Sequence, residues 1–147
     1  MKHIIINVGR QLGSGGHDIG RMLALDFQAK YYDRELLNLA AKEGSCVFVG
    51  RCADYVLRDF KNTVNIFITA SMNYRIKQIM NKQHLDAEAA RKFVEQSEGK
   101  RADYYNYYTG KKWGSAESYD LCIDSSKLGL VETEKLIAQF IRKRFEE

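Results

Sequence analysis

The sequence predicts an α/β fold, a three-layer α/β/α sandwich around a five-stranded parallel sheet. Five short apolar segments alternate with segments of helical periodicity, and this alternation requires parallel strands joined by helices that cover both faces of the sheet. The chain has 147 residues, of which 45% are apolar, enough to bury one core of ordinary size. No internal repeat or low-complexity tract interrupts the pattern. We therefore expect residues 1–147 to form a single domain.

The first strand and the first helix are the best-defined pair of elements. Residues 3–8 read His-Ile-Ile-Ile-Asn-Val, a run too continuously apolar for a half-exposed strand and typical of a central parallel strand. A glycine-rich turn follows this run. From residue 17 to about 30, apolar side chains recur at helical spacing, so an amphipathic helix is expected to leave the turn. These side chains are Ile19, Met22, Leu23 and Phe27.

The later elements alternate in the same way. Asp33 is expected to cap a helix through Ala41, and Ser71 to precede a helix that carries Ile76 and Ile79. The other strands are expected at 30–32, 46–49, 63–69 and 119–123. The other helices are expected at about 53–60, 86–98 and 131–145. Residues 99–118 are rich in Lys, Tyr, Gly and Ser and resemble a mobile loop or lid.

Composition narrows the class of protein. The longest apolar runs, at 4–6 and 46–49, fall far short of the roughly 20 residues that cross a bilayer, and no apolar signal-peptide core follows the N-terminus. We therefore expect a cytoplasmic protein with no membrane partner. The net charge of +4 suits polyanionic ligands but does not by itself indicate nucleic acid.

The cysteines predict neither a disulfide framework nor a zinc site. Cys46, Cys52 and Cys122 are odd in number and lack CxxC spacing. We expect them to be reduced and mostly buried, as free cysteines usually are. The sequence predicts no protein metal centre.

The turn after the first strand carries the strongest chemical signal. It reads Gly-Arg-Gln-Leu-Gly-Ser-Gly-Gly-His over residues 9–17. Glycines let the backbone bend so that successive N–H groups converge, and the helix that follows adds the positive end of its dipole. An anion such as sulfate or phosphate is therefore expected at the backbone amides of Gly13, Ser14, Gly15, Gly16 and His17. The alternative is a strand-to-helix turn that binds no ligand.

This turn departs from the common phosphate loop. The Walker form GxxxxGK[ST] places a lysine where it reaches the transferred phosphates and a hydroxyl where it holds magnesium. When that form is laid over Gly13-Ser14-Gly15, the lysine position is Gly16 and the hydroxyl position is His17. Both groups are missing from their usual places. The turn therefore predicts phosphate binding more firmly than catalysis.

Four blocks of the sequence together resemble a known family. They read GRQLGSGG at 9–16, YYDRELL at 31–37, VGRCADY at 49–55 and YDLCIDS at 119–125. In this order, at the expected strand ends, they resemble bacterial cytidylate-kinase-like proteins over nearly the whole chain. The resemblance implies a P-loop kinase fold that binds small-molecule nucleotides, with ATP and Mg²⁺ as cofactors and a nucleoside monophosphate, cytidylate above all, as acceptor. In this lysine-less branch, Arg10 is the nearest residue able to supply the missing cation.

Two residues are candidates for the acceptor site. Arg51 follows a buried strand, and the carboxyl ends of parallel strands are where open α/β sheets bind ligands. A guanidinium binds phosphate in a bidentate manner that lysine does not reproduce. The resemblance implies that Arg51 contacts the monophosphate and that Asp54 contacts a sugar or base. The alternative is a surface salt bridge between these two residues.

The lid-like segment 99–118 supplies further candidates. Lid arginines stabilise charge on the transferring phosphoryl group, and this electrostatic effect requires no general base. Arg101 is the leading candidate, and Arg75 and Asp103 are expected in supporting roles. The alternative is that the Tyr and Trp residues pack against the body while Lys and Arg stay solvated, and for the tyrosines we favour this alternative.

One departure concerns the acceptor clamp. In the family, a long helical insertion precedes the third strand, whereas here residues 40–43 run almost directly into that strand near 43–45. The chain is either a minimal form or a sequence from which a mobile segment is missing, and the close match of both flanks favours the second. The crossover over 33–45 barely supplies the dozen residues that parallel strands require.

Two other classes of function remain open. The missing Walker lysine favours a non-catalytic nucleotide sensor, which would bind ATP tightly without turnover. The alternation of basic and aromatic residues at 99–118 favours, more weakly, a nucleic-acid-binding module with salt-dependent affinity for single strands. We favour ATP-dependent phosphoryl transfer over the sensor, and both over nucleic-acid binding.

Overall fold

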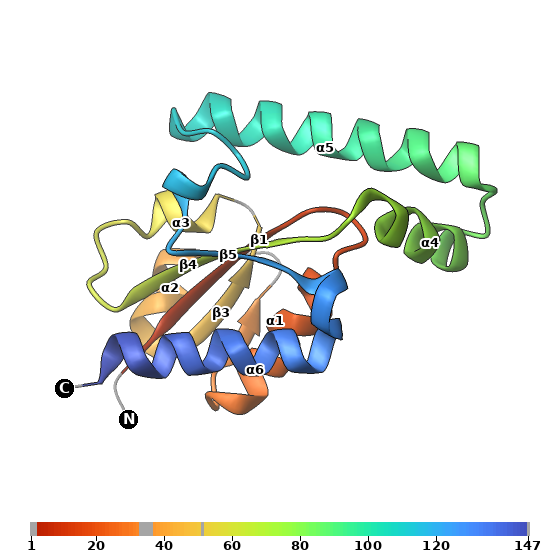
Figure 1. Ribbon diagram of the computed structural model, residues 1–147. Helices are drawn as coiled ribbons and strands as arrows, with labels where there is room; N and C mark the ends of the chain where they lie inside the picture. The colour runs from red at the N-terminus through yellow and green to blue at the C-terminus, as the bar shows by residue number, and fades with distance from the viewer. Residues whose placement is uncertain (1–2, 33–36, 51, 147) are drawn as a thin grey trace.

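The computed structural model describes residues 3–32, 37–50 and 52–146 and has a five-stranded parallel sheet with helices on both faces (Figure 1). The strand order is β2-β3-β1-β4-β5, and every neighbouring pair is parallel. The strands are β1 (Ile5–Arg10), β2 (Lys30–Tyr32), β3 (Cys46–Val49), β4 (Thr63–Thr69) and β5 (Leu121–Asp124). The predicted fold class is therefore confirmed.

The helices are connected to the strands in alternation. They are α1 (Gly16–Asp26), α2 (Leu37–Glu43), α3 (Ala53–Val56), α4 (Met72–Gln83), α5 (Ala87–Thr109) and α6 (Ser125–Phe145), with a short 3₁₀ helix at Ala116–Ser118. Figure 1 shows α5 apart from the sandwich, across the top of the view. None of the helices in the described part of the chain is both long and apolar enough to cross a membrane.

The core forms because the central strands are apolar on both faces. On one face, Ile6, Val8 and Ile66 pack with the apolar stripes of α1 and α6. On the other face, Ile5 and Phe48 pack with Ala41 of α2, Ala53 of α3 and Leu57, which follows α3. These buried side chains explain the continuous apolar runs that predicted a covered parallel sheet.

The prediction of a loop over residues 99–118 is wrong for its first half. Helix α5 continues through this stretch to Thr109, and the chain then turns at Gly110, whose φ of 71° is left-handed and whose N–H donates to the Asn106 carbonyl. The segment is polar because most of its side chains face solvent, and the buried Tyr105 attaches the helix to the body. The polar composition was therefore that of an exposed helix.

Several other expectations differ from the structure at element ends. Strand β1 begins and ends two residues later than expected, which places Arg10 inside the strand. Helix α3 ends at Val56, and α6 begins at Ser125 with a break at Gly129, where φ is 82°. The expected cap Asp33 lies outside the described residues.

The expectation of mostly buried cysteines is also wrong. Cys46 is buried, Cys52 is half-buried and Cys122 is exposed, and all three are free thiols. Cys122 is exposed because it lies on β5, which ends the sheet and pairs with β4 alone. The number of cysteines carries no information about which strand lies at an edge.

A polar cluster joins α1 to α6 away from the carboxyl ends of the strands. Arg142 pairs with Asp26 and lies over the ring of Phe27, with its guanidinium carbon 4.7 Å from the ring centroid. Glu134 on α6 is buried beside Asp26. Burial, together with the neighbouring Asp26 carboxylate, raises the pKa of Glu134 from 4.5 to about 7.

This cluster predicts a pH dependence of stability. Because the pKa of Glu134 is higher in the folded state, the folded protein holds a proton that the unfolded chain releases above about pH 4.5. The resulting stabilisation is fully present below that pH and is lost as the pH rises through about 7. Glu134→Gln should therefore gain stability relative to the wild type across this range, measured by urea unfolding at a series of pH values. A constant difference at every pH would contradict the shift.

Candidate active site

A pocket of about 520 Å³ lies at the carboxyl ends of β1 and β3 and is also lined by residues of α5. It collects residues from the ends of β1 and β3, from α1 and α3, and from α5 and the segment after it. The lining residues are Asn7, Val8, Gly9, Arg10, His17, Val49, Gly50, Cys52, Asp54, Lys100, Arg101, Tyr104, Tyr105, Trp113 and Tyr119. The side chains of several cations and aromatic residues thus meet at one end of the sheet.

The turn between β1 and α1 is tightly bound to the body. Gly13 and Gly15 have φ values of 81° and 84°, a conformation that favours glycine. Ser14 lies between them and is fully buried; its Oγ donates to the Gln11 carbonyl at 2.7 Å, and its own carbonyl accepts from Ser125 Oγ. These contacts hold the turn against the start of α6.

The pocket and the glycine turn overlap only in part. Arg10 and His17 line the pocket, but its described lining does not include Gly13, Ser14, Gly15 or Gly16. The Ser14 N–H donates to the Gln11 carbonyl at 3.2 Å, so this amide already has a partner within the turn. Anion binding at the amides from Gly13 to His17 therefore stays a prediction.

The side chain of Arg10 occupies the space that a Walker lysine would need. A Cβ atom at Gly16 would lie 2.4 Å from both Cβ and Cγ of Arg10, a distance that real side chains do not show. The Arg10 guanidinium continues toward Gly50, where an added Cβ would lie 2.6 Å from Nη1. Arg10 thus crosses the start of α1 and ends beside the end of β3, inside the pocket. Position 16 thus has no room for a lysine, because the Arg10 side chain fills the space above it.

Gly16→Ala should therefore destabilise the protein by about 1–3 kcal/mol, the usual cost of overpacking. The atoms in conflict are near the base of the Arg10 side chain, so they cannot swing away as a flexible tip would. Chemical unfolding of the variant provides the measurement. Gly99→Ala is the matched control, because it also lies in a helix and no atom lies within 4 Å of the added Cβ. In an Arg10→Gly background, which lacks both conflicting atoms, Gly16→Ala should cost much less, and an equal loss in that background would contradict the packing argument.

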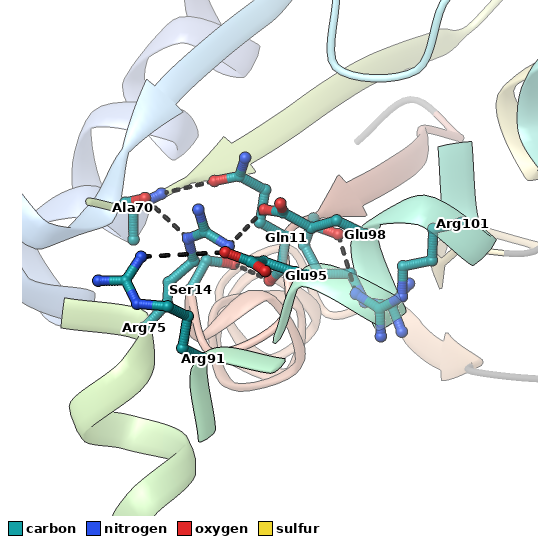
Figure 2. A network of polar contacts seen from close by, with 9 residues as sticks. Gln11, Ser14, Ala70, Arg75, Arg91, Glu95, Glu98 and Arg101 are labelled. Carbon is teal, nitrogen blue, oxygen red and sulfur yellow. Dashed lines mark hydrogen bonds and ion pairs between the residues drawn. The ribbon is translucent and has the colours of Figure 1, made fainter. Parts of the chain in front are cut away.

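A chain of polar contacts connects the loop after β1 to α5 (Figure 2). It runs from Gln11 through Ala70 and Arg75 to Glu98, and Arg101 lies next to Glu98 on α5. Arg75 of α4 is buried; its Nε donates to the Ala70 carbonyl at 2.9 Å, and its guanidinium pairs with Glu98 of α5. Gln11 accepts from the Ala70 N–H at 3.1 Å. Arg75 does not line the pocket and instead joins α4 to α5.

Arg101 of α5 reaches the end of β1. Its Nη1 donates to the Arg10 carbonyl at 3.1 Å, and the residue lines the pocket. Burial lowers the pKa of Arg101, and the nearby Glu98 opposes that change. Arg101 therefore lies next to the residue that ends β1.

Asp54 lies at the aromatic part of the pocket. It is buried on α3, and its carboxylate accepts from the hydroxyl of Tyr105 at 2.6 Å. Burial and the contact with Asp54 raise the pKa of Tyr105. The ring of Tyr105 stacks near that of Tyr119, with centroids 6.1 Å apart, and Trp113 packs edge-on against Phe67. An aromatic wall with one carboxylate suits a planar ligand that carries hydrogen-bond donors.

The other predicted site residues have different outcomes. Arg51 lies outside the described residues, although Gly50 and Cys52 on either side of it line the pocket. Asp103 is exposed on α5 and does not line the pocket. Arg10, His17, Asp54 and Arg101, in contrast, are brought together there.

Sequence reasoning missed several lining residues. Lys100, Tyr104 and Trp113 line the pocket, although the sequence placed them in a loop without a separate role. The tyrosines were expected to pack against the body, which holds for Tyr105 but not for Tyr104, Tyr107 and Tyr108, whose exposed fractions are 52%, 81% and 58%. A helical reading of residues 99–109 would have separated the inward and outward positions.

The model of the Cytidylate kinase-like family matches residues 5–44 and 40–127. These two matched segments meet at residues 40–44, just before β3. No curated protein matches the chain.

Solved structures share the fold over nearly the whole chain. An uncharacterised protein from Eubacterium ventriosum ATCC 27560 is 29% identical, with a TM-score of 0.87 over 94% of this chain and 98% of the other. Shikimate kinase from Acinetobacter baumannii, in complex with shikimate, is 12% identical, with a TM-score of 0.67 over 99% and 97%. A gluconokinase from Sinorhizobium meliloti 1021 is 13% identical, with a TM-score of 0.63 over 97% and 95%. At such identities the two kinases indicate the fold alone.

Proposed function

Because the chain belongs to the cytidylate kinase-like family and is a kinase-like phosphotransferase with a P-loop kinase fold, we propose that it transfers a phosphoryl group from ATP to a nucleoside monophosphate, with cytidylate the first candidate. The observation that carries this proposal is the meeting of Arg10, Lys100 and Arg101 in one pocket at the carboxyl edge of a parallel sheet. Such edges are where α/β folds bind their ligands.

The cations would act on the phosphates. Phosphoryl transfer requires the attacking and leaving oxygens to be held in line while charge on the transferred group is stabilised. Arg10 reaches the pocket from β1, and Lys100 and Arg101 reach it from α5, so positive charge comes from two separate elements. We assign Arg10 and Arg101 to charge stabilisation, and the amides of the turn from Gly13 to His17, apart from that of Ser14, which donates to Gln11, to phosphate binding.

The acceptor would lie toward the aromatic wall. Tyr105, Trp113 and Tyr119 offer faces for a base, and the Asp54 carboxylate can accept a hydrogen bond from an amino group or a sugar hydroxyl. Arg51 remains our candidate for the acceptor phosphate. Arg75, through its contacts with Ala70 and Glu98, would support the site by holding α4 and α5 together. We assign no contact to Asp103.

Magnesium fits this site as a companion of the nucleotide. Among the described residues that line the pocket, Asp54 is the sole carboxylate, and it already accepts from Tyr105. No group of three His, Cys, Asp or Glu side chains able to hold a metal occurs within the described ranges. Mg²⁺ commonly binds through substrate phosphates and several waters. When bound, it would neutralise charge on the phosphates, and the protein side chains would orient them.

The test is a panel of nucleoside monophosphates incubated with ATP and Mg²⁺, with ADP formation as the readout. We expect turnover with at least one acceptor and the fastest with cytidylate. We propose that the family carries further acceptor-binding residues between α2 and β3, because the matched segments of the family model meet there. The panel is therefore run both on this chain and on a chain with a family segment inserted after Glu43. Lack of turnover by both chains would contradict the proposal.

The nucleotide sensor is the second candidate, favoured by Arg10 occupying the lysine space above Gly16. A sensor would bind ATP without passing phosphate to any acceptor. Calorimetric titration with ATP and Mg²⁺, made alongside the acceptor panel, separates the two functions. Tight binding without ADP formation in either chain would favour the sensor.

A further inference from the structure

Three side chains from three different elements form a line of polar contacts at the pocket. His17 is in the first turn of α1, Arg10 ends β1 and Tyr31 lies in β2. His17 Nε2 lies 3.3 Å from Arg10 Nη2, and His17 Nδ1 lies 2.7 Å from the Tyr31 hydroxyl. The imidazole thus lies between the arginine and the tyrosine.

The chemistry of the outer groups determines the direction of each hydrogen bond. A guanidinium only donates, so Nε2 of His17 must be the acceptor. In a neutral imidazole the other nitrogen then carries the proton, so Nδ1 donates to the Tyr31 hydroxyl oxygen. The arrangement requires the neutral ring in one tautomer, and the Tyr31 hydroxyl, which can donate or accept, is compatible with that tautomer.

An arginine needs such support to act at a defined place. Its long side chain has many rotamers, and fixing it in one of them costs conformational entropy. The base of Arg10 is held by contact with Gly16, and its tip passes Gly50. The hydrogen bond to His17 orients the Arg10 guanidinium, because it constrains the position of Nη2.

We propose that His17 is a positioning residue, which holds the Arg10 guanidinium in the pocket in the orientation that serves the phosphates, with Tyr31 holding the imidazole. The part of this inference that concerns phosphate rests on the proposed function. The part that concerns the Arg10 side chain stands on the contacts of His17 with Arg10 and Tyr31. A purely structural reading is that His17 and Tyr31 join α1 to β2, and it predicts no effect on Arg10.

A pair of substitutions separates these readings. Gln at position 17 places an amide oxygen near the position of Nε2 and can still accept from Arg10. Asn is shorter and places its polar group near Nδ1, so it can retain the contact with Tyr31 but not that with Arg10. The two variants carry the same functional group, and each preserves a different half of the line. Tyr31→Phe removes the hydroxyl and leaves both other residues unchanged.

The first readout is the mobility of the Arg10 Nε–H group in the ligand-free protein, measured by the ¹⁵N heteronuclear NOE and assigned with Arg10→Lys. We expect His17→Asn to lower the NOE clearly, His17→Gln to retain most of it, and Tyr31→Phe to fall between them. Equal NOE values in wild type and His17→Asn would overturn the inference, as would equal losses in the Asn and Gln variants. Thermal unfolding of each variant confirms that the compared proteins are folded.

The second readout is a double-mutant cycle on the affinity for ATP with Mg²⁺. If His17 acts through Arg10, His17→Asn should weaken binding severalfold in the wild type and have no further effect in Arg10→Ala. Equal weakening in both backgrounds would show a direct role for His17 and overturn the inference. If the wild type binds no ATP, the proposed function fails, and the NOE measurement still decides whether His17 positions Arg10.

Discussion

Arg10→Ala is expected to lower both nucleotide affinity and turnover. A hydrogen bond between charged groups contributes about 1.5–3 kcal/mol, so losing one to a phosphate should weaken ATP binding by roughly 10- to 150-fold. The rate should fall further, because a cation that stabilises the transferring phosphoryl group contributes on the order of 10³-fold or more. The expectation follows from the place of Arg10, which occupies the lysine space above Gly16 and lines the pocket. Calorimetry gives the affinity, and steady-state kinetics give kcat and KM.

A lysine restored at the Walker position provides the sharpest control. Gly16→Lys as a single substitution should not give an active protein, because a Cβ at position 16 conflicts with the Arg10 side chain. In an Arg10→Gly background both conflicting atoms are removed, so the double variant Arg10→Gly, Gly16→Lys should regain part of the activity lost in Arg10→Gly. If Arg10→Ala retained wild-type affinity for ATP and wild-type turnover, the role assigned to Arg10 in the site would be contradicted.

Arg101→Ala is expected to lower turnover on the order of 10³-fold while leaving ATP affinity within a fewfold. The guanidinium lies in the pocket beside the end of β1, where a preorganised charge stabilises developing charge without reorganisation. One of its donors is already used by the Arg10 carbonyl, so its contribution to initial binding should be small. The measurement compares kcat with the dissociation constant for ATP.

The matched control is Arg91→Ala. Arg91 is on the same helix, has a half-exposed side chain and makes an exposed pair with Glu95, so its loss removes the same charge away from the pocket. We expect kinetics close to those of the wild type. A fall in affinity that equals the fall in kcat/KM for Arg101→Ala would instead mean that Arg101 binds the ground state. Thermal unfolding checks that the loss of its contact with the Arg10 carbonyl does not unfold α5.

The sequence alone determined the order of the elements and the class of fold. Continuous apolar runs at Ile4–Ile6, Cys46–Val49 and Ile66–Ile68 predict covered parallel strands, because a strand buried on both faces has no polar alternation. The glycine-rich turn after the first run predicts where a helix begins. The bounds of β3 and β4 agree with the prediction for the same reason, since local periodicity and apolar content are properties of short segments.

The tertiary structure decided which polar side chains meet. Arg10 and Gly16 are close in sequence, yet only the course of the Arg10 side chain over α1 explains why no side chain fits at position 16. The helix over residues 99–109 was missed because its polar face is indistinguishable in composition from a loop, whereas the buried Tyr105 and its bond to Asp54 come from a distant segment. Contacts between distant segments depend on sheet order and helix packing, and no local pattern encodes them. The sequence therefore determined the sheet and its glycine turn, and packing determined the pocket.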